Sequence, residues 1–164
     1  MNLQTLDNSL QKGLRHLLVA LMAAMALDVL WQIFTRFFVG DPSVWTEELA
    51  RFILIWLGCL GAAFGVGEGF HLRMDYFLQK TRPAHRAQLE RLIPAFVLLI
   101  ALSVFVFGGA RLAYLAHELK QTSPALGIGM IWVYAVIPAS GLIMVISCLQ
   151  QMTSPHSHPE TVTD

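Results

Sequence analysis

Charged residues are scarce in this sequence. Asp, Glu, Lys and Arg make up 13% of its 164 residues, whereas a soluble domain carries about 25%. Residues 52–67, 92–110 and 127–149 contain none of the four, and the mean hydropathy is +0.58. Because so little charge cannot cover a water-facing surface, soluble classes of protein are excluded and an integral membrane protein is predicted.

Cysteine is nearly absent too. Cys59 and Cys148 both lie inside apolar runs, so neither a disulfide between loops nor a metal-ligand spacing is expected. The formal net charge is zero, which offers no basic surface to nucleic acid. Ser103, Ser140 and Ser147 have no His or Lys on a neighbouring turn, so we predict no catalytic residue and no enzyme.

Histidine is not placed for a redox cofactor. A haem held between helices needs two imidazoles at matched depth. His16, His71 and His85 stand at one boundary of the apolar runs, His117 stands at the other, and the remaining two lie in the polar tail. We therefore expect no cofactor.

Four apolar runs are long enough to cross a bilayer. A helix rises about 1.5 Å per residue, so a hydrocarbon core of about 30 Å takes about 20 residues. The first run ends in FTRFFVGDP instead of a small-residue cleavage site, so we expect it to be retained and not removed as a signal peptide. The sequence predicts an all-α membrane protein with one domain over residues 1–150, spans at about 14–37, 48–69, 92–115 and 127–149, and a disordered tail at 151–164.

Lys and Arg are distributed unevenly about these spans, and cytoplasmic loops are enriched in both. Four of the 11 fall on one side: Arg36, Arg51, Arg111 and Lys120. The other seven fall on the side of the termini: Lys12, Arg15, Arg73, Lys80, Arg82, Arg86 and Arg91. Both termini are therefore expected in the cytoplasm, and Val39–Glu47 and Glu118–Ala125 outside.

Two segments beside the spans mix apolar and polar residues at helical spacing. Leu6, Leu10, Leu14 and Leu17 recur near the N-terminus, and residues 74–93 combine aromatic side chains with several cations. Such patterns are typical of helices that lie in the headgroup region. They are equally typical of extensions of the neighbouring spans, and both interpretations stay open.

The stretch VWTEELARFILIW, at residues 44–56, places charges at the start of the second span. Glu47 and Glu48 stand four and three residues before Arg51, the spacings at which helical side chains meet. With Arg36 at the end of the first span, we expect them to form a partly buried outer charge cluster. The alternative is a set of solvated ion pairs.

Small residues mark one face of the second span. At about 100° per residue, Arg51, Gly58, Gly65 and Gly69 fall close together, with Gly61 beside them. Small residues at this spacing let another helix backbone approach closely in lipid. We expect this face to be a helix-packing or subunit interface.

Asp28 is a carboxylate well inside the first span. Intramembrane acids often serve as ion or proton sites. Asp28, Gln32 and Arg36 are spaced four residues apart, however, so hydrogen bonds along one helix face can partly satisfy each of them. A structural polar stripe is favoured over an ion-coupling site.

The fourth span contains Pro138, which removes a backbone donor and predicts a kink near Tyr134. Polar residues are few in all four spans. Four such helices alone are too apolar to line a path for a polar solute.

Together these stretches resemble the small membrane subunit of the tripartite ATP-independent periplasmic (TRAP) transporters. The resemblance covers residues 12–150 and rests on TRFF, WTEELARFILIWLGCLGAA, GFHLRMDYF and PALGIGMIWVYAVIPASGLIMV. Pro138 is followed by Ala-Ser-Gly, a minor departure from the family pattern. The matching positions are Arg36; Trp45, Glu47, Glu48 and Arg51; Gly61 and Ala62; His71 and Asp75; and Leu126, Gly127, Trp132, Tyr134 and Pro138.

The resemblance implies a subunit without chemistry of its own, in the inner membrane of a bacterium. In this family a soluble periplasmic protein captures an organic acid, typically a carboxylate, and a large multi-span subunit moves it with sodium. The expected partners are therefore the large subunit, the binding protein and the lipid bilayer, with no nucleic acid. The glycine face and the aromatic, proline-containing fourth span are the candidate contact surfaces, together with Trp45; His71 and Asp75 form a motif of the cytoplasmic loop.

Two other classes of protein stay open. One is an autonomous small carrier or channel that uses Asp28 after oligomerising through the glycine face. The other is a membrane redox protein that uses its histidines. The transported acid cannot be named, because the residues that would select it are expected in the large subunit.

Overall fold

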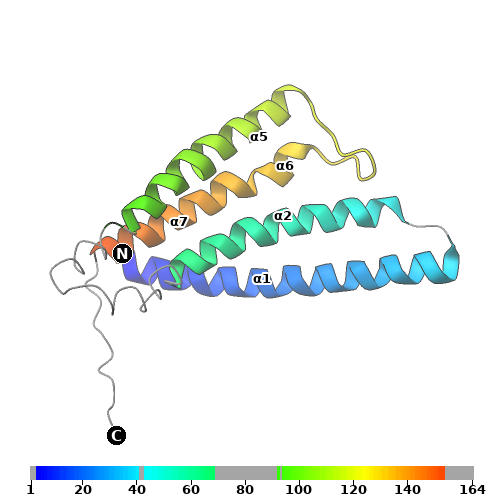
Figure 1. Ribbon diagram of the computed structural model, residues 1–164, viewed down its shortest axis with the longest axis horizontal. Helices are drawn as coiled ribbons and strands as arrows, with labels where there is room; N and C mark the ends of the chain where they lie inside the picture. The colour runs from blue at the N-terminus through cyan, green and yellow to red at the C-terminus, as the bar shows by residue number, and fades with distance from the viewer. Residues whose placement is uncertain (1–2, 41–42, 69–91, 93, 154–164) are drawn as a thin grey trace, which may run out of the picture.

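The computed structural model describes residues 3–40, 43–68, 92 and 94–153 (Figure 1). Four helices are long and apolar enough to cross a membrane: Ser9–Val39, Val44–Gly67, Pro94–Glu118 and Met130–Met152. Within the described ranges no strand forms, and an isolated bridge joins Thr122 to Gly129. The expected all-α architecture with four spans is confirmed, while the domain limits stay predictions.

The first span is longer than its apolar run. α1 extends without a break over Leu3–Phe34 and continues as a π-helix, η1, over Thr35–Val39. The apolar periodicity near the N-terminus therefore extends the span and does not form a separate interfacial helix. The second candidate for such a helix, residues 74–93, lies outside the described residues except for Leu92.

A glycine ends this long helix. Gly40 adopts φ 74° and ψ 1°, and it donates its backbone N–H to the carbonyl of Thr35 at 3.0 Å. Glycine takes this left-handed conformation without steric cost. Thr35 in turn donates its hydroxyl to the carbonyls of Trp31 and Gln32, at 3.1 Å each. Such bonds compete with the helical ladder, so they loosen the helix where the π-turn begins.

The other three spans differ in regularity. The second is a single α-helix, the third contains a π-helix, and the fourth is interrupted. Their bounds are Val44–Gly67 for α2; Ala101–Gly108 for η2 and Gly109–Glu118 for α5 in the third span; and Met130–Tyr134 for α6 and Val136–Thr153 for α7 in the fourth.

The interruption between α6 and α7 falls at Ala135. Pro138 has no N–H with which to bond the carbonyl of Tyr134, four residues earlier. The helix is therefore interrupted where the proline predicts a kink.

α2 and α7 form the centre of the bundle (Figure 1). α2 packs on α1 and on α7, and α7 also packs on η2. The buried core along this seam includes Leu60 and Ala63 of α2 and Met144 and Cys148 of α7. The molecule thus consists of two helical hairpins joined along α2 and α7.

Two glycines set the closest approach between the third and fourth spans. A Cβ atom built at Gly141 of α7 would lie 2.7 Å from the Cβ of Phe105 and 3.1 Å from the backbone nitrogen of Val106. A Cβ atom at Gly109 would lie 2.7 Å from Cγ2 of Ile137. Because ordinary carbon contacts are about 3.5–4.0 Å long, only glycine fits at both positions without movement of the helices.

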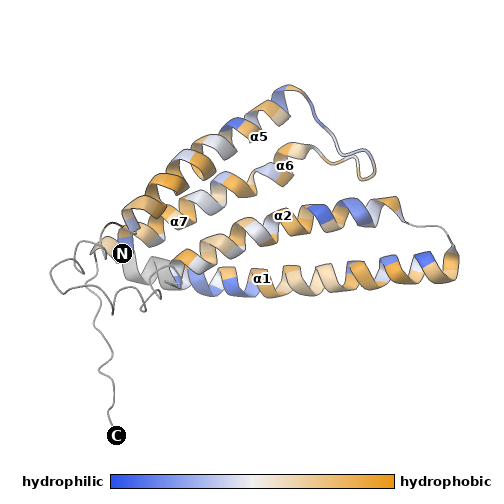
Figure 2. Ribbon diagram, in the orientation of Figure 1, coloured by the Kyte–Doolittle hydropathy of each residue, from blue (hydrophilic) through white to orange (hydrophobic). Residues whose placement is uncertain are grey.

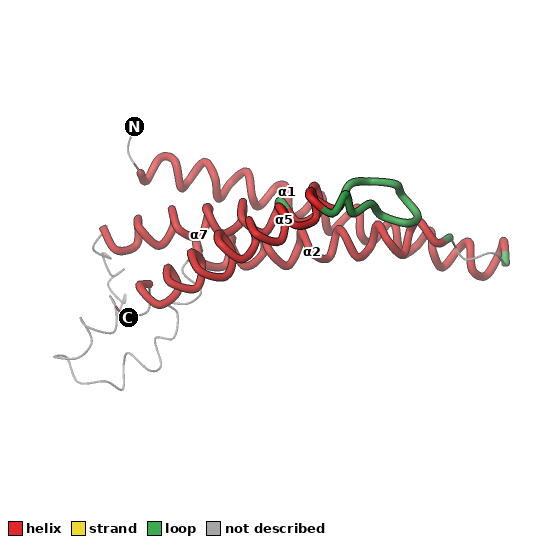
Figure 3. Tube along the Cα trace, turned by 90° about the horizontal axis from the view of Figure 1, so that it is seen from above, coloured by secondary structure: helices red, strands yellow, loops and turns green. Residues whose placement is uncertain are grey.

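Hydrogen bonds tie the helices at one end of the bundle. Gln11 Nε2 of α1 donates to Ser147 Oγ of α7 at 3.3 Å, and Gln151 Nε2 donates to the carbonyl of Val66 of α2 at 2.6 Å. Figures 1 and 3 show the start of α1 and the end of α7 at this end, and the loop before α6 toward the other. The side of the membrane that each end faces stays a prediction.

Apolar residues dominate the spans and much of their outward surface (Figure 2). In the chain by itself, Leu27, Leu30 and Ile33 of α1 are at least half exposed, as are Phe96 and Phe107 of the third span. Apolar surface of this extent marks contact with lipid or with another protein.

Candidate functional site

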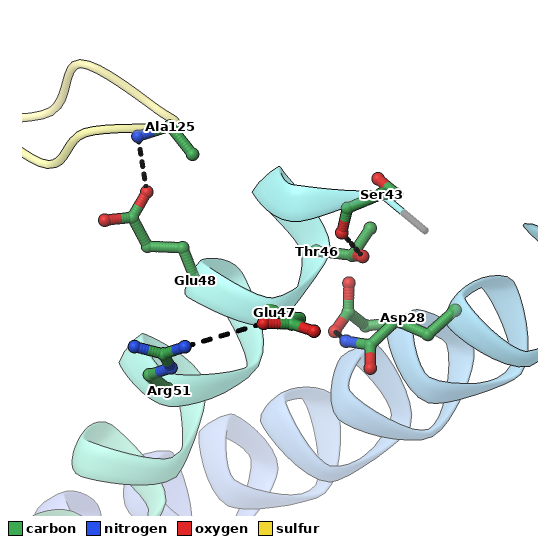
Figure 4. Close-up of polar contacts among 8 residues, drawn as sticks. Asp28, Ser43, Thr46, Glu47, Glu48, Arg51 and Ala125 are labelled. Atoms are coloured by element: carbon green, nitrogen blue, oxygen red, sulfur yellow. Dashed lines mark hydrogen bonds and ion pairs between the residues drawn. The ribbon is translucent and has the colours of Figure 1, made fainter. Parts of the chain in front are cut away.

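The charged stretch occupies the first two turns of α2 (Figure 4). Ser43 is the N-cap residue, but its side chain makes no capping hydrogen bond. Its carbonyl instead accepts a 2.7 Å hydrogen bond from the hydroxyl of Thr46, which is completely buried. The buried hydroxyl of Thr46 therefore stabilises this turn. Glu47 and Glu48 project from it in different directions (Figure 4).

Glu48 binds the loop that precedes α6. Its Oε2 accepts the backbone N–H of Ala125 at 2.9 Å and that of Leu126 at 3.2 Å. The Leu126 N–H is shared with the hydroxyl of Ser123, at 3.1 Å. Bonds from N–H groups to a carboxylate are charge-assisted and stronger than neutral ones. Glu48 therefore fastens α2 to a turn that lies 77 residues further along the chain.

In the described chain the carboxylate of Glu48 accepts peptide N–H groups and forms no ion pair, so its membership of the expected outer charge cluster stays a prediction. Glu47 pairs with Arg51 at 3.6 Å, with side chains 60% and 73% exposed. Arg36 makes no ion pair with any other described residue. In the chain by itself the Glu47–Arg51 pair thus matches the alternative of a solvated ion pair, and its burial against a partner stays a prediction.

A pocket of about 430 Å³ lies where η1 faces the start of α2. It brings Arg36 and Glu47 to one site, although no direct ion pair joins them. Its lining residues are Val29, Gln32, Ile33, Arg36, Phe37, Ser43 and Glu47.

Asp28 lies between α1 and α2. It is 7% exposed, its Oδ2 accepts a 2.9 Å hydrogen bond from Gln32 Nε2, and its side chain points toward the start of α2 (Figure 4). Thr35 is the next buried residue on this side, whereas Arg36 is exposed. The inward stripe is therefore Asp28–Gln32–Thr35, because spacings of four and three residues stay on one helix face better than two spacings of four.

The glycine face of α2 has open space beside it at Gly58 and Gly61. Apart from its own helix, no described atom lies within 4 Å of a Cβ atom built at Gly58 or Gly61. Gly58 is exposed, and Gly61 and Gly65 are partly buried. Among the described residues no other helix covers the face at Gly58 and Gly61, and the role of the glycine face as an interface stays a prediction. Outside the described residues lie Gly69, His71 and Asp75.

The aromatic candidates lie near the bundle end that carries the charges. Trp132 of α6 is 71% exposed and Trp45 of α2 is also exposed. Tyr134 and Pro138 are partly buried. Two broad indole rings are thus available to lipid headgroups or to a partner, since such rings favour the membrane interface.

Sequence reasoning missed two features of this architecture. Gly109 and Gly141, and not Gly58 and Gly61 of α2, carry close packing between the helices inside the chain. Their signal was present, because the pairs Gly108–Gly109 and Ser140–Gly141 place small residues in two consecutive spans. The contact of Glu48 with the loop has no signal in the sequence, since a carboxylate near a helix start has many possible partners.

These features define a small multi-pass membrane protein. The described residues contain no group of three His, Cys, Asp or Glu side chains that could hold a metal ion. Residues 25–155 match the family model described as "Tripartite ATP-independent periplasmic transporters, DctQ component". The chain belongs to this family, and it is a small permease subunit of a tripartite transporter in the inner membrane.

Three relatives illustrate the match. The sialic acid TRAP transporter small permease protein SiaQ of Vibrio cholerae is 31% identical over 139 residues, which cover 82% of this chain and 76% of that protein. The C4-dicarboxylate small permease protein DctQ of Rhodobacter capsulatus is 29% identical, over 68% of this chain and 48% of its own length. The isethionate TRAP transporter permease protein DctMQ of Oleidesulfovibrio alaskensis is 28% identical, over 82% of this chain but only 22% of that longer protein.

Proposed function

We propose that this chain is a scaffold subunit that moves no solute by itself. It packs on a large multi-span membrane subunit, and the complex takes up an organic acid with sodium after a periplasmic binding protein has delivered it. The observation that carries the proposal is the open space beside α2 at Gly58 and Gly61, where an added Cβ atom would meet no described atom within 4 Å outside its own helix.

The chemistry of this face suits another helix. In lipid, helices gain little from apolar burial, so close packing of small residues and polar pairs must supply association. Gly58, Gly61 and the exposed Ala62 leave a shallow strip along α2, and the Glu47–Arg51 pair stands at its end. A partner helix seated there would pack on the strip and shield the ion pair from water.

The longer relative supports a large partner. In DctMQ of Oleidesulfovibrio alaskensis, the segment similar to this chain takes up 22% of one permease polypeptide. That polypeptide joins the segment similar to this chain to a much longer remainder. A separate small subunit is therefore expected to bind a separate large protein that corresponds to that remainder.

The interior of the chain supports the absence of transport by this subunit alone. The 430 Å³ pocket is confined to residues of η1, the adjoining part of α1 and the start of α2. Asp28 is buried and hydrogen-bonded to Gln32, which favours a structural role over that of an ion carrier.

The names of the relatives and the resemblance support a proposal for the substrate class. The relatives are named for sialic acid, C4-dicarboxylates and isethionate, all of which are organic acids. We infer that this transporter also takes up an organic acid, coupled to sodium as in the family that the sequence resembles.

Reconstitution tests this function. Liposomes with a sodium gradient receive the large subunit, this chain and the cognate binding protein, and uptake of a labelled organic acid is measured. Omission of this chain is expected to abolish uptake, and this chain alone is expected to carry none. Sodium-driven flux through this chain alone would refute the scaffold role and would direct attention to Asp28.

The interface is tested by co-purification. Gly61→Leu adds a side chain to the outward strip and is expected to release the large subunit. Gly13→Leu is the matched control, since Gly13 is an exposed glycine of α1 with nothing within 4 Å of its Cβ position. Equal recovery of the large subunit with both variants would show that the α2 strip is not the contact.

A further inference from the structure

The pocket between η1 and the start of α2 is not explained by helix packing within the chain. It lies at the ends of two membrane spans, Ser9–Val39 and Val44–Gly67. The ends of spans stand at the level of lipid headgroups. A ligand of this pocket is therefore expected to lie at the depth of the lipid headgroups.

The polar wall of the pocket offers separate sites for an anion and a cation. Arg36 is exposed and pairs with no acidic side chain among the described residues. Glu47 also lines the pocket, and its 3.6 Å contact with Arg51 leaves its side chain 60% exposed. A ligand with both a negative and a positive group complements this wall.

The other wall is apolar and continues along α1. Ile33 is 50% and Phe37 78% exposed in the chain by itself. Trp31, Phe34 and Phe38 form a run of neighbouring rings, with centroids 5.9 Å and 5.0 Å apart. Aromatic side chains collect at the membrane interface. Hydrocarbon attached to the ligand can therefore lie against α1.

We propose that this pocket binds a zwitterionic phospholipid with a primary ammonium group, of the phosphatidylethanolamine type. Arg36 holds the phosphate, Glu47 holds the ammonium, and an acyl chain lies along Val29 and Ile33. The volume of about 430 Å³ falls within the range of about 300–1,000 Å³ that is usual for small-molecule sites, and Arg–phosphate contacts are strong and directional.

The test counts lipids on the purified complex of this chain with its large subunit by native mass spectrometry. Delipidated complex is titrated with phosphatidylethanolamine, phosphatidylglycerol or diacylglycerol, and inorganic phosphate is added as a competitor. The wild type is expected to prefer phosphatidylethanolamine, and millimolar phosphate is expected not to displace it. Arg36→Gln should weaken the binding of both phospholipids about tenfold, which is the effect expected from the loss of one charge-assisted contact. Glu47→Gln should weaken the binding of phosphatidylethanolamine and leave the binding of phosphatidylglycerol unchanged.

Arg111→Gln is the matched control, because Arg111 is an exposed arginine on another span and lies outside the pocket; it should leave all lipid binding unchanged. Unchanged lipid binding by Arg36→Gln would overturn the proposal. Displacement of the lipid by inorganic phosphate would show a site for free anions and would overturn it too. Release of the large subunit by Arg36→Gln without loss of a lipid would show that the pocket holds a side chain of that subunit instead.

Discussion

The contact between the third and fourth spans gives the sharpest test of the fold. Gly141→Ala adds one Cβ atom that would stand 2.7 Å from the Cβ of Phe105, 3.0 Å from Cγ2 of Val106 and 3.1 Å from its backbone nitrogen. A Cβ atom and a backbone nitrogen cannot swing aside as the end of a long side chain can. The helices must therefore move apart, and overpacking of this kind costs about 1–3 kcal/mol.

The same substitution at Gly58 separates this cost from helix propensity. Alanine favours the helical state over glycine by about 0.8–1 kcal/mol, and a Cβ atom at Gly58 meets nothing within 4 Å outside its own helix. Gly58→Ala is thus expected to stabilise the isolated chain slightly. The difference in free energy of unfolding between the Gly141 and Gly58 variants isolates the close approach, and it should be about 1–3 kcal/mol.

Unfolding of the purified chain in detergent, followed by loss of helical circular dichroism as SDS is added, measures both variants under one condition. The midpoint for Gly141→Ala is expected below that of the wild type and that for Gly58→Ala at or above it. Coincident midpoints for the two variants would refute the reasoning, because they would mean that the third and fourth spans do not meet at Gly141.

Three further predictions follow from the site and the topology. A membrane-impermeant thiol reagent applied outside cells should label Cys introduced at Ser43 but not at Thr81, and labelling at Thr81 would reverse the proposed orientation of the termini. Glu48→Gln should speed hydrogen exchange in the loop before α6, because a neutral amide is a weaker acceptor for the two N–H groups of that loop. Glu118→Gln should not change this exchange, and equal exchange in the two variants would contradict the contact between Glu48 and the loop. Asp28→Asn, which retains an oxygen that can accept the Gln32 bond, should leave sodium-driven uptake by the complete transporter intact, and loss of uptake would assign Asp28 to ion coupling.

Much of the fold could be predicted from the sequence, because in a membrane the absence of charge directly marks a span. The second span illustrates this: the charge-free run at 52–67 lies within α2, Val44–Gly67. The spacing of Leu6, Leu10, Leu14 and Leu17 predicted helix before the first apolar run, but it could not decide between an interfacial helix and an extension of the span, which α1 forms from Leu3. The interruption near Pro138 was predicted, since a missing backbone donor acts on its own helix.

The candidate site was less predictable, because it depends on which helix faces which. The spacing of Glu47 and Arg51 on one helix was enough to predict their pairing. Helical periodicity could not show that Glu48 turns to Ala125, because that contact joins segments far apart in the chain. It also could not decide whether Gly58 packs inside the chain or faces outward.

The central position of α2 has a consequence for biosynthesis. α1 and α2 are neighbours in the chain and pack on each other, but the second partner of α2, α7, belongs to the fourth of the described spans and leaves the ribosome after the other three. After the first hairpin has been inserted, the α7-facing side of α2 must therefore wait among lipids, or beside an insertion factor, until the fourth span arrives. A nascent chain stalled before residue 136 should thus hold α1 against α2 and leave that side of α2 open to crosslinking from the lipid phase.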